Sequence, residues 1–270
     1  MLPLPGQEKR VVFPASKALP AWIYLPVKLS QPDRFIIAVH GISREYKNQL
    51  AAYKKLADKL GCGLLVPEFS RKDFSRYQQI TKDAFSLRAD TELNTLLITL
   101  KVQLQQPFLK IHLCGYSGGA QFAHRYAMLH PQNIASLVLC SAGWYTFPSP
   151  SVEFPYGTGK WPDWLGKLRV DDMLRLPILV MVGEQDIKRE KSLRQSKSLD
   201  AQQGCNRVER AKSWVEAVSK QKQKMSAGVV EYRQLPNLGH DFQASADSGE
   251  MMLHIESFWN DIRREKVCAI

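Results

Sequence analysis

The sequence lacks the usual marks of a membrane-bound or exported protein. None of its apolar runs approaches the roughly 18 residues that a membrane-spanning helix needs. The first six residues, Met1 to Gly6, contain two prolines and none of the apolar segment that a signal peptide requires. We therefore expect no membrane span, no secretory signal and a cytoplasmic location.

Cysteine is scarce, and no common metal or cofactor motif is present. No H-E-x-x-H motif occurs, and no G-x-G-x-x-G follows a predicted strand. Residues 157–160, Gly-Thr-Gly-Lys, resemble the end of a P-loop, but Trp161 stands where Ser or Thr is required. An odd number of scattered cysteines without a C-x-x-C pair favours free thiols in a reducing compartment; they are at 62, 114, 140, 205 and 268. We predict neither a cofactor nor a metal site.

Acidic residues are too few to balance the basic ones, and the net charge is +11. Much of the excess lies between 187 and 225, where the spacing over 207–224 is helical. Such a run usually forms a solvated helix face, and no aromatic residues are interleaved with it as in nucleic-acid-binding surfaces. We predict no specific nucleic-acid partner, while a protein partner for this region stays open, as does the oligomeric state.

The length of 270 residues and the ordinary apolar and charged fractions, 44% and 23%, fit one large α/β domain over 1–270. Strand-like and helix-like segments alternate along the chain. This alternation predicts a mostly parallel, doubly wound sheet with helices on both faces. Predicted strands cover 11–13, 22–25, 35–39, 63–66, 108–114, 136–140, 178–182 and 229–235. Predicted helices cover 46–60, 87–105, 119–130 and 250–265, and a charged helical region fills 190–225.

The most informative segment lies between the predicted strand 108–114 and the predicted helix 119–130. Its residues Gly115-Tyr116-Ser117-Gly118-Gly119 form a G-x-S-x-G motif in the strand–turn–helix context that marks a nucleophile elbow. The sharp turn lifts the Ser117 hydroxyl clear of the sheet. Glycine is required at 115 and 119 because the strand and the helix cross too closely for a Cβ atom.

A serine nucleophile needs a histidine base and a carboxylate that orients it. His240 follows the last predicted strand in a loop, from which its side chain can reach over a strand end. Asp186 lies just after the predicted strand 178–182 and is the predicted orienting acid, with Glu184 on the same turn as the fallback. We assign structural roles to the other histidines, at 40, 112, 124, 130 and 254.

An oxyanion hole would complete this chemistry. The backbone N–H of Gly118, directly after Ser117 and at a helix N-terminus, is one predicted donor. The second is the N–H of Ile42, in the loop that follows the predicted strand 35–39. Donors of this kind are each worth about 10²–10³ in turnover.

With these motifs in place, the chain resembles the α/β-hydrolase superfamily of serine esterases and lipases over most of its length, from 40–41 to 239–240. The order Ser117, Asp186, His240 is the one expected of that superfamily. The segments 115–125, 67–69 and 141–145 are loosely similar to polyhydroxybutyrate-depolymerase-like bacterial esterases. The resemblance implies an α/β-hydrolase fold, with a cap inserted at about 144–175.

The cap-like segment 144–175 is rich in aromatic residues, which either line an acyl pocket or pack the cap onto the sheet. We name four as candidate substrate-binding residues: Trp144, Tyr145, Phe147 and Trp161. The sequence thus predicts a serine hydrolase that cleaves a small-molecule carboxylic ester through an acyl-enzyme. The alternatives are an acyltransferase or peptidase with the same triad, and a non-catalytic ligand-binding protein on a hydrolase scaffold.

Overall fold

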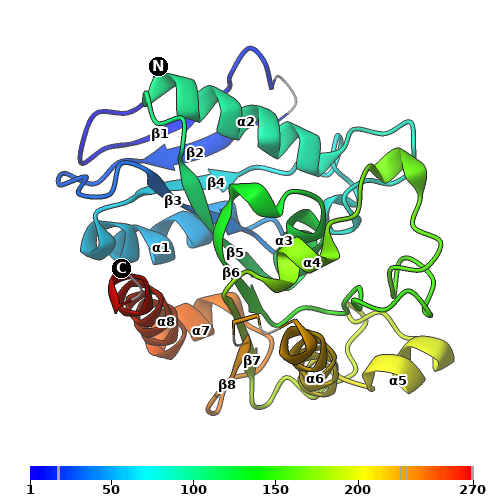
Figure 1. The fold of residues 1–270 in the computed structure, drawn as a ribbon. Helices are drawn as coiled ribbons and strands as arrows, with labels where there is room; N and C mark the ends of the chain where they lie inside the picture. The colour runs from blue at the N-terminus through cyan, green and yellow to red at the C-terminus, as the bar shows by residue number, and fades with distance from the viewer. Residues whose placement is uncertain (17–18, 226, 229, 269–270) are drawn as a thin grey trace.

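A computed structural model describes residues 1–16, 19–225, 227–228 and 230–268 of the chain (Figure 1). Its centre is an eight-stranded sheet in the order β1-β2-β4-β3-β5-β6-β7-β8. The strands are β1 (Glu8–Val11), β2 (Ala21–Tyr24), β3 (Arg34–Val39), β4 (Gly63–Pro67), β5 (Lys110–Tyr116), β6 (Ile134–Cys140), β7 (Ile178–Gly183) and β8 (Val230–Leu235).

Eight α-helices and three short 3₁₀ turns accompany the sheet in the described residues. The helices are α1 (Tyr46–Leu60), α2 (Ala89–Gln103), α3 (Gly118–Leu129), α4 (Val170–Leu174), α5 (Lys197–Gln203), α6 (Arg207–Lys224), α7 (Phe242–Asp247) and α8 (Glu250–Cys268). The turns are η1 (Tyr77–Gln79), η2 (Pro131–Asn133) and η3 (Asp163–Leu165).

The six strands from β4 to β8 in the sheet order run parallel, and β2 runs antiparallel to both of its neighbours, β1 and β4. Parallel strands place their carboxyl ends at one edge of the sheet. The loops after β3, β5, β7 and β8 therefore emerge at the same edge, where open α/β sheets carry their sites.

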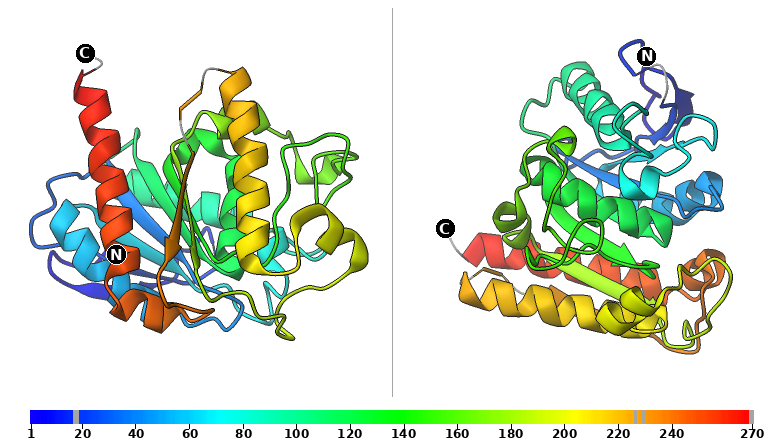
Figure 2. Two further views of the ribbon diagram at one scale, coloured as in Figure 1. Left: turned by 90° about the horizontal axis from the view of Figure 1, so that it is seen from below. Right: turned by 90° about the vertical axis from the view of Figure 1, so that its right-hand side faces the viewer.

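Helices cover both faces of the sheet, as the two views in Figure 2 show. On β3, Phe35, Ile37 and Val39 enter the core beneath α2, α3, α4 and α6, while Ile36 and Ala38 face the core beneath α1, α7 and α8. Such a strand is apolar throughout because it has no solvated side. The predicted mostly parallel sheet with helices on both faces is confirmed.

Two element predictions need correction. The first strand is Glu8–Val11 and not 11–13, because this edge strand is polar and only its last residue is buried. Helix α7 was not predicted, since only the side chain of Asp241, which accepts a hydrogen bond from the Ala244 N–H, marks its start. Of the predicted strand 229–235, position 229 lies outside the described residues.

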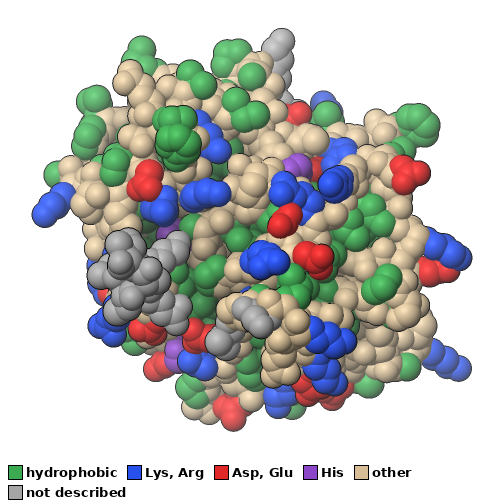
Figure 3. Space-filling model, viewed as in Figure 1, with side chains coloured by type: hydrophobic (Ala, Val, Ile, Leu, Met, Phe, Trp, Pro, Cys, Tyr) green, Lys and Arg blue, Asp and Glu red, His purple; other side chains and the backbone are tan. Residues whose placement is uncertain are grey.

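The basic region 187–225 is less solvated than predicted. Arg207, Arg210 and Lys222 of α6 are buried, and each binds an internal acceptor, respectively Asp186, Asp200 and the carbonyl of Leu176. A solvated basic face is therefore the wrong description of these three side chains. On the molecular face seen in Figure 3, Lys and Arg are scattered, with Asp and Glu among them.

The described cysteines at 62, 114, 140 and 205 are free, and burial raises the pKa of the Cys62 thiol to about 12. None of the described helices is both long and apolar enough to span a membrane. Within the described ranges, no group of three or more His, Cys, Asp and Glu side chains is placed to hold a metal ion.

Candidate active site

Ser117 occupies a tight turn between β5 and α3, as the motif predicts. Its backbone has φ 52° and ψ −111°, a conformation that an L-residue rarely adopts. A Cβ atom at Gly115 would lie 2.3 Å from the carbonyl of Gly119, and one at Gly119 would lie 2.0 Å from the carbonyl oxygen of Val39. Gly115 is thus required by the close crossing of β5 and α3, and Gly119 by the close approach of α3 to the end of β3.

The three predicted triad residues meet at the carboxyl edge of the sheet. His240 Nε2 lies 3.0 Å from Ser117 Oγ, and His240 Nδ1 lies 2.8 Å from Asp186 Oδ2. The imidazole ring also stacks on Tyr116, with ring centroids 5.5 Å apart. Ser117 and Asp186 are both buried. The order of contacts is that of a nucleophile, a base and an orienting acid.

The loops that carry His240 and Asp186 are fastened to each other. The Gln185 N–H donates to the carbonyl of Leu238 at 2.8 Å. Glu184, the fallback acid, does not reach His240; its carboxylate accepts from the N–H of Asn237 at 3.2 Å, and Asn237 has a positive φ of 56°. Glu184 thus shapes the turn before His240, and the acid in contact with the imidazole is Asp186.

The sequence analysis missed one residue of this constellation, Arg207. Its Nη1 donates to Asp186 Oδ1 at 3.0 Å, so each carboxylate oxygen of Asp186 has its own partner. The side chains of Arg207 and Asp186 are almost fully buried, with 2% and 1% of their surface exposed. Its Nη2 donates to Ser192 Oγ at 3.1 Å, and Ser192 lines the cleft above Ser117. No signal in the sequence marks Arg207, because the burial of Asp186 that calls for a cation is visible only in the structure.

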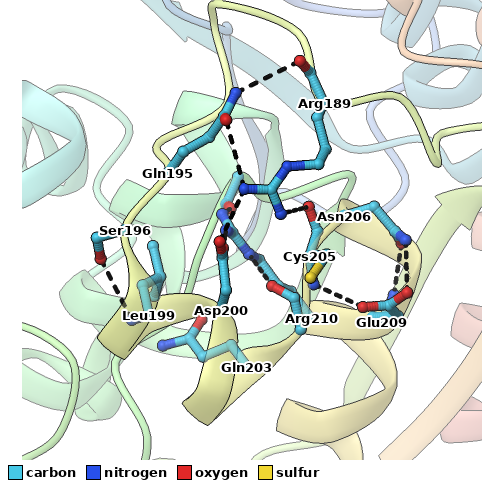
Figure 4. A network of polar contacts seen from close by, with 12 residues as sticks. Arg189, Gln195, Ser196, Leu199, Asp200, Gln203, Cys205, Asn206, Glu209 and Arg210 are labelled. Carbon is cyan, nitrogen blue, oxygen red and sulfur yellow. Dashed lines mark hydrogen bonds and ion pairs between the residues drawn. The ribbon is translucent and has the colours of Figure 1, made fainter.

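A polar network holds the α5–α6 segment that carries Arg207 (Figure 4). Asp200 of α5 accepts from both Arg189 and Arg210, each at 2.8 Å. Arg210 also donates to the carbonyl of Gly143 at 2.7 Å, in the loop after β6. This network fastens α6 against the segment between β6 and β7, and Arg207 stands at the first position of that helix.

The two predicted oxyanion donors lie side by side. A Cβ atom built on Gly118 would be 3.3 Å from Ile42 N and 2.7 Å from its Cγ2. One built on Gly41 would be 3.5 Å from Ser117 Cβ, so the loop after β3 passes directly over the serine. Within the described residues, neither the N–H of Gly118 nor that of Ile42 has a hydrogen-bond acceptor.

His40 and His124 are buried and hold loops around the site. Nδ1 of His40 contacts the carbonyl of Gly41, and its Nε2 accepts from the N–H of Phe69. His124 makes the equivalent pair of contacts, with the carbonyl of Ala120 and the N–H of Thr146. Burial lowers the pKa of His40 to about 4 and holds the pKa of His124 well below its usual range.

The cleft at Ser117 has a volume of about 290 Å³, and its walls mix polar and apolar side chains. It lies between the loop after β3, the Ser192 loop and the start of α7. Its lining comprises Gly41, Ile42, Ser43, Glu45, Gln49, Tyr116, Ser117, Ser192, His240, Asp241 and Phe242. This volume lies at the lower end of the range for ligand pockets.

The four aromatic candidates for substrate binding do not line this cleft. Tyr145 is buried and stacks on Trp214 at 5.0 Å, and Trp161 packs edge-on against Phe154. Phe147 is buried in the core on the face of the sheet that α2, α3, α4 and α6 cover. Trp144 differs from these three, because its ring is contacted by arginine side chains.

A larger hollow of about 1050 Å³ lies near α4, and His130 and Arg88 are among its lining residues. Both bind the buried carboxylate of Asp90, at 2.8 Å and 2.6 Å. The lining contains neither serine nor cysteine. His130 and Arg88 are thus engaged with Asp90, and the hollow offers no nucleophile comparable to Ser117.

No family model and no curated protein matches the chain. Solved structures do. Poly(aspartic acid) hydrolase-1 from Sphingomonas sp. KT-1 is similar with a TM-score of 0.77 at 21% identity, over 92% of this chain and 98% of that one. A poly(3-hydroxybutyrate) depolymerase from Bordetella parapertussis is similar with a TM-score of 0.74 at 20% identity, over 94% of this chain and 90% of that one.

A third match is an alpha-beta serine hydrolase homologue from Coxiella burnetii, with a TM-score of 0.56 at 17% identity, over 94% of this chain and 98% of that one. The protein has the α/β-hydrolase fold. Within this fold, Ser117 occupies the strand-to-helix turn after β5 at the centre of the sheet, while Asp186 and His240 follow β7 and β8.

Proposed function

We propose that the protein is a serine hydrolase that cleaves carboxylic esters through an acyl-enzyme intermediate. The observation that carries this proposal is the contact of 3.0 Å between Ser117 Oγ and His240 Nε2. A serine hydroxyl is a weak nucleophile unless a base removes its proton as it attacks. In this constellation His240 is that base.

The acylation step follows from the contacts of the imidazole. Ser117 Oγ attacks the carbonyl carbon of the ester while His240 Nε2 takes the hydroxyl proton, and the same proton then passes to the departing alcohol. Asp186 accepts a hydrogen bond from Nδ1–H, which keeps Nε2 free to act as the base and stabilises the imidazolium. Water activated by His240 releases the acid and regenerates Ser117.

The N–H groups of Gly118 and Ile42 would bind the oxyanion of the tetrahedral intermediates. Support comes from their proximity to each other and to Ser117, and from the position of Gly118 at the start of α3, where the helix dipole favours negative charge. Because the donors are fixed by the backbone, they need no rearrangement as the charge develops.

The small volume of the cleft supports esters with short acyl or alcohol portions as substrates. Two neighbours in fold are named for the hydrolysis of poly(aspartic acid) and poly(3-hydroxybutyrate), an amide-linked and an ester-linked polymer. We propose the ester as the preferred bond, because an amide is more strongly stabilised by resonance and an alkoxide leaves far more readily than an unprotonated amide nitrogen.

Substitution of the nucleophile tests the proposal directly. Ser117→Ala should abolish hydrolysis of p-nitrophenyl acetate and butyrate, and its thermal unfolding should stay cooperative. A fluorophosphonate probe should label the native protein at Ser117 and leave the variant unlabelled. Folded native protein that reacts with neither the probe nor a broad panel of esters would refute the proposal.

The same triad could serve transfer to an alcohol or the cleavage of an amide. Product analysis separates these reactions: p-nitrophenyl butyrate with added alcohols reveals transesterification, and matched p-nitroanilides reveal amidase activity. We expect the free acid to be the main product and the amide to react more slowly than the ester.

A further inference from the structure

A third buried arginine, Arg125 of α3, has no carboxylate partner among the described residues, unlike Arg207 and Arg210. Its side chain is fully buried. Nε donates to Thr146 Oγ1 at 2.9 Å, and Nη1 donates to the carbonyls of Gln78 and Gln121. These acceptors are neutral, so the positive charge is not balanced. A buried charge without a counter-ion is costly, which calls for an explanation.

Three polar atoms around this guanidinium also lack hydrogen-bond partners within the described chain. They are Nη2 of Arg125 and the side-chain oxygens of Gln78 and Gln121. The backbone carbonyls of the same two glutamines bind the guanidinium, so the unsatisfied groups belong to one small region. Buried polar groups are nearly always paired, and three unpaired groups in one place indicate a site for a polar ligand.

A second cation, Arg194, lies close to the same region. The guanidinium of Arg125 is 4.0 Å from the ring centroid of Trp144, and that of Arg194 is 5.5 Å from it. Arg194 also lies 5.3 Å from the ring of Tyr156 and forms no ion pair with any described residue. Arg194 is exposed whereas Arg125 is fully buried, so a ligand that pairs with both cations must enter from the side of Arg194. Burial, and then the charge of Arg194, lower the pKa of Arg125 to about 9.

The region lies behind the nucleophile along α3. Gln121 is four residues after Ser117 and Arg125 is eight, which puts all three toward one side of the helix. Each step of four residues advances about 6 Å along the axis, and long helical side chains point back toward the N-terminus. Gln121 lies between Ser117 and Arg125 on the helix, and its N–H donates to the carbonyl of Ser117. A Cβ atom at Gly143 would meet its amide nitrogen at 2.9 Å.

We propose that Arg125 and Arg194 form a subsite for a carboxylate carried by the acyl portion of the substrate. The inference rests on the proposed esterase function and names its substrate class: monoesters of short dicarboxylic acids. The carboxylate accepts a hydrogen bond from Arg125 Nη2. It accepts a second from Gln121, once the side-chain amide of that residue has rotated. It also supplies the counter-charge that both guanidiniums lack. Trp144, whose ring both cations contact, forms an apolar wall that excludes water and strengthens the charge pairing.

Two substrates of equal chain length test this subsite. We expect a kcat/KM for p-nitrophenyl hemiglutarate at least roughly tenfold above that for p-nitrophenyl valerate, since charged hydrogen bonds contribute about 1.5–3 kcal/mol. Arg194→Gln should lower this ratio, mainly by raising KM for the hemiglutarate. The matched control is Lys188→Gln, which removes one charge from the same exposed loop and should leave the ratio unchanged.

Binding of glutarate to the Ser117→Ala protein provides a second readout that needs no turnover. Calorimetry should detect binding, and both Arg194→Gln and Arg125→Gln should weaken it by about tenfold or more. If Arg125→Gln fails to fold, the Arg194 variant still decides. Equal rates for the two esters, or a preference for valerate, would overturn the subsite while the esterase proposal stands. If neither ester is hydrolysed, the esterase proposal fails, and glutarate binding alone supports or overturns the subsite.

Discussion

Arg207 and Arg125 are both buried arginines near the candidate active site, and they differ in what they face. Arg207 meets the carboxylate of Asp186 at 3.0 Å, whereas Arg125 meets only neutral oxygens and an indole ring. The first arginine completes a charge pair within the chain. The second has no counter-charge among the described residues, and an uncompensated buried charge is destabilising. Arg207 thus supports the arrangement of Asp186 and His240, whereas Arg125 is the cation that we propose for a substrate carboxylate.

The largest expected effect is a loss of turnover when the negative charge of Asp186, the partner of Arg207, is removed. Asp186→Asn should lower kcat by about 10⁴, because an amide favours the wrong imidazole tautomer and does not stabilise the imidazolium. It also converts Arg207 into a second unpaired cation. Steady-state hydrolysis of p-nitrophenyl acetate measures the effect. A loss of less than about tenfold would mean that Asp186 does not orient the base.

Removal of the cation should mainly affect stability. Arg207→Met leaves the buried Asp186 carboxylate without its partner and should cost about 3–5 kcal/mol in the free energy of unfolding, measured by urea denaturation. The double variant Asp186→Asn/Arg207→Met should recover part of this loss, because it leaves no buried charge behind. Strictly additive losses would show that the pair is not coupled.

The buried histidines allow the same comparison of paired and unpaired groups. His40 and His124 have no acidic partner within the described chain, and burial depresses the pKa of both, that of His40 to about 4. The unfolded chain therefore binds protons that the folded chain excludes, so stability falls as the pH drops from about 6.5 toward 4. His40 alone should account for about 3 kcal/mol of this loss.

Urea titrations at pH 7.5, 6 and 5 measure the slope of stability against pH. In a His40→Gln variant the slope below pH 6.5 should be shallower by about one proton. An unchanged slope would show that His40 is not kept neutral by its surroundings.

The smallest effect is expected at Arg125. Arg125→Met removes hydrogen bonds to neutral acceptors but strands no carboxylate, so it should cost about 1–2 kcal/mol in the free energy of unfolding, clearly less than Arg207→Met. Parallel urea titrations of both variants measure the contrast. A loss at Arg125 equal to that at Arg207 would remove the distinction between the two arginines.

The elements and contacts that depend on local sequence were predictable. The strand–turn–helix context of Ser117 and the loop positions of Asp186 and His240 follow from turn chemistry and from strand order. The predicted side-by-side placement of these three residues agrees with the observed distances. Their catalytic roles, and those of Gly118 and Ile42, stay predictions.

What the sequence did not reveal depends on which way a side chain faces. Arg207 reaches Asp186 from a helix that starts 21 residues later, and no short-range pattern distinguishes it from the exposed lysines of the same helix. The aromatic residues of 144–161 were recognisable as a group, but helix α6 decides that Tyr145 stacks on Trp214 and not on a ligand. Such choices are made by tertiary packing.

The fastening of the turn after β7 to the turn after β8 has a further consequence. The bonds from Gln185 to Leu238 and from Asn237 to Glu184 join these two turns without any contribution from β5. The imidazole and its acid therefore form a preassembled unit that does not rely on the hydroxyl for its alignment. The nucleophile at position 117 can therefore be replaced without disturbing this pair. A cysteine thiol at that position would meet an imidazole that is already oriented, so the protein could be redesigned for thioester exchange with His240 and Asp186 unchanged.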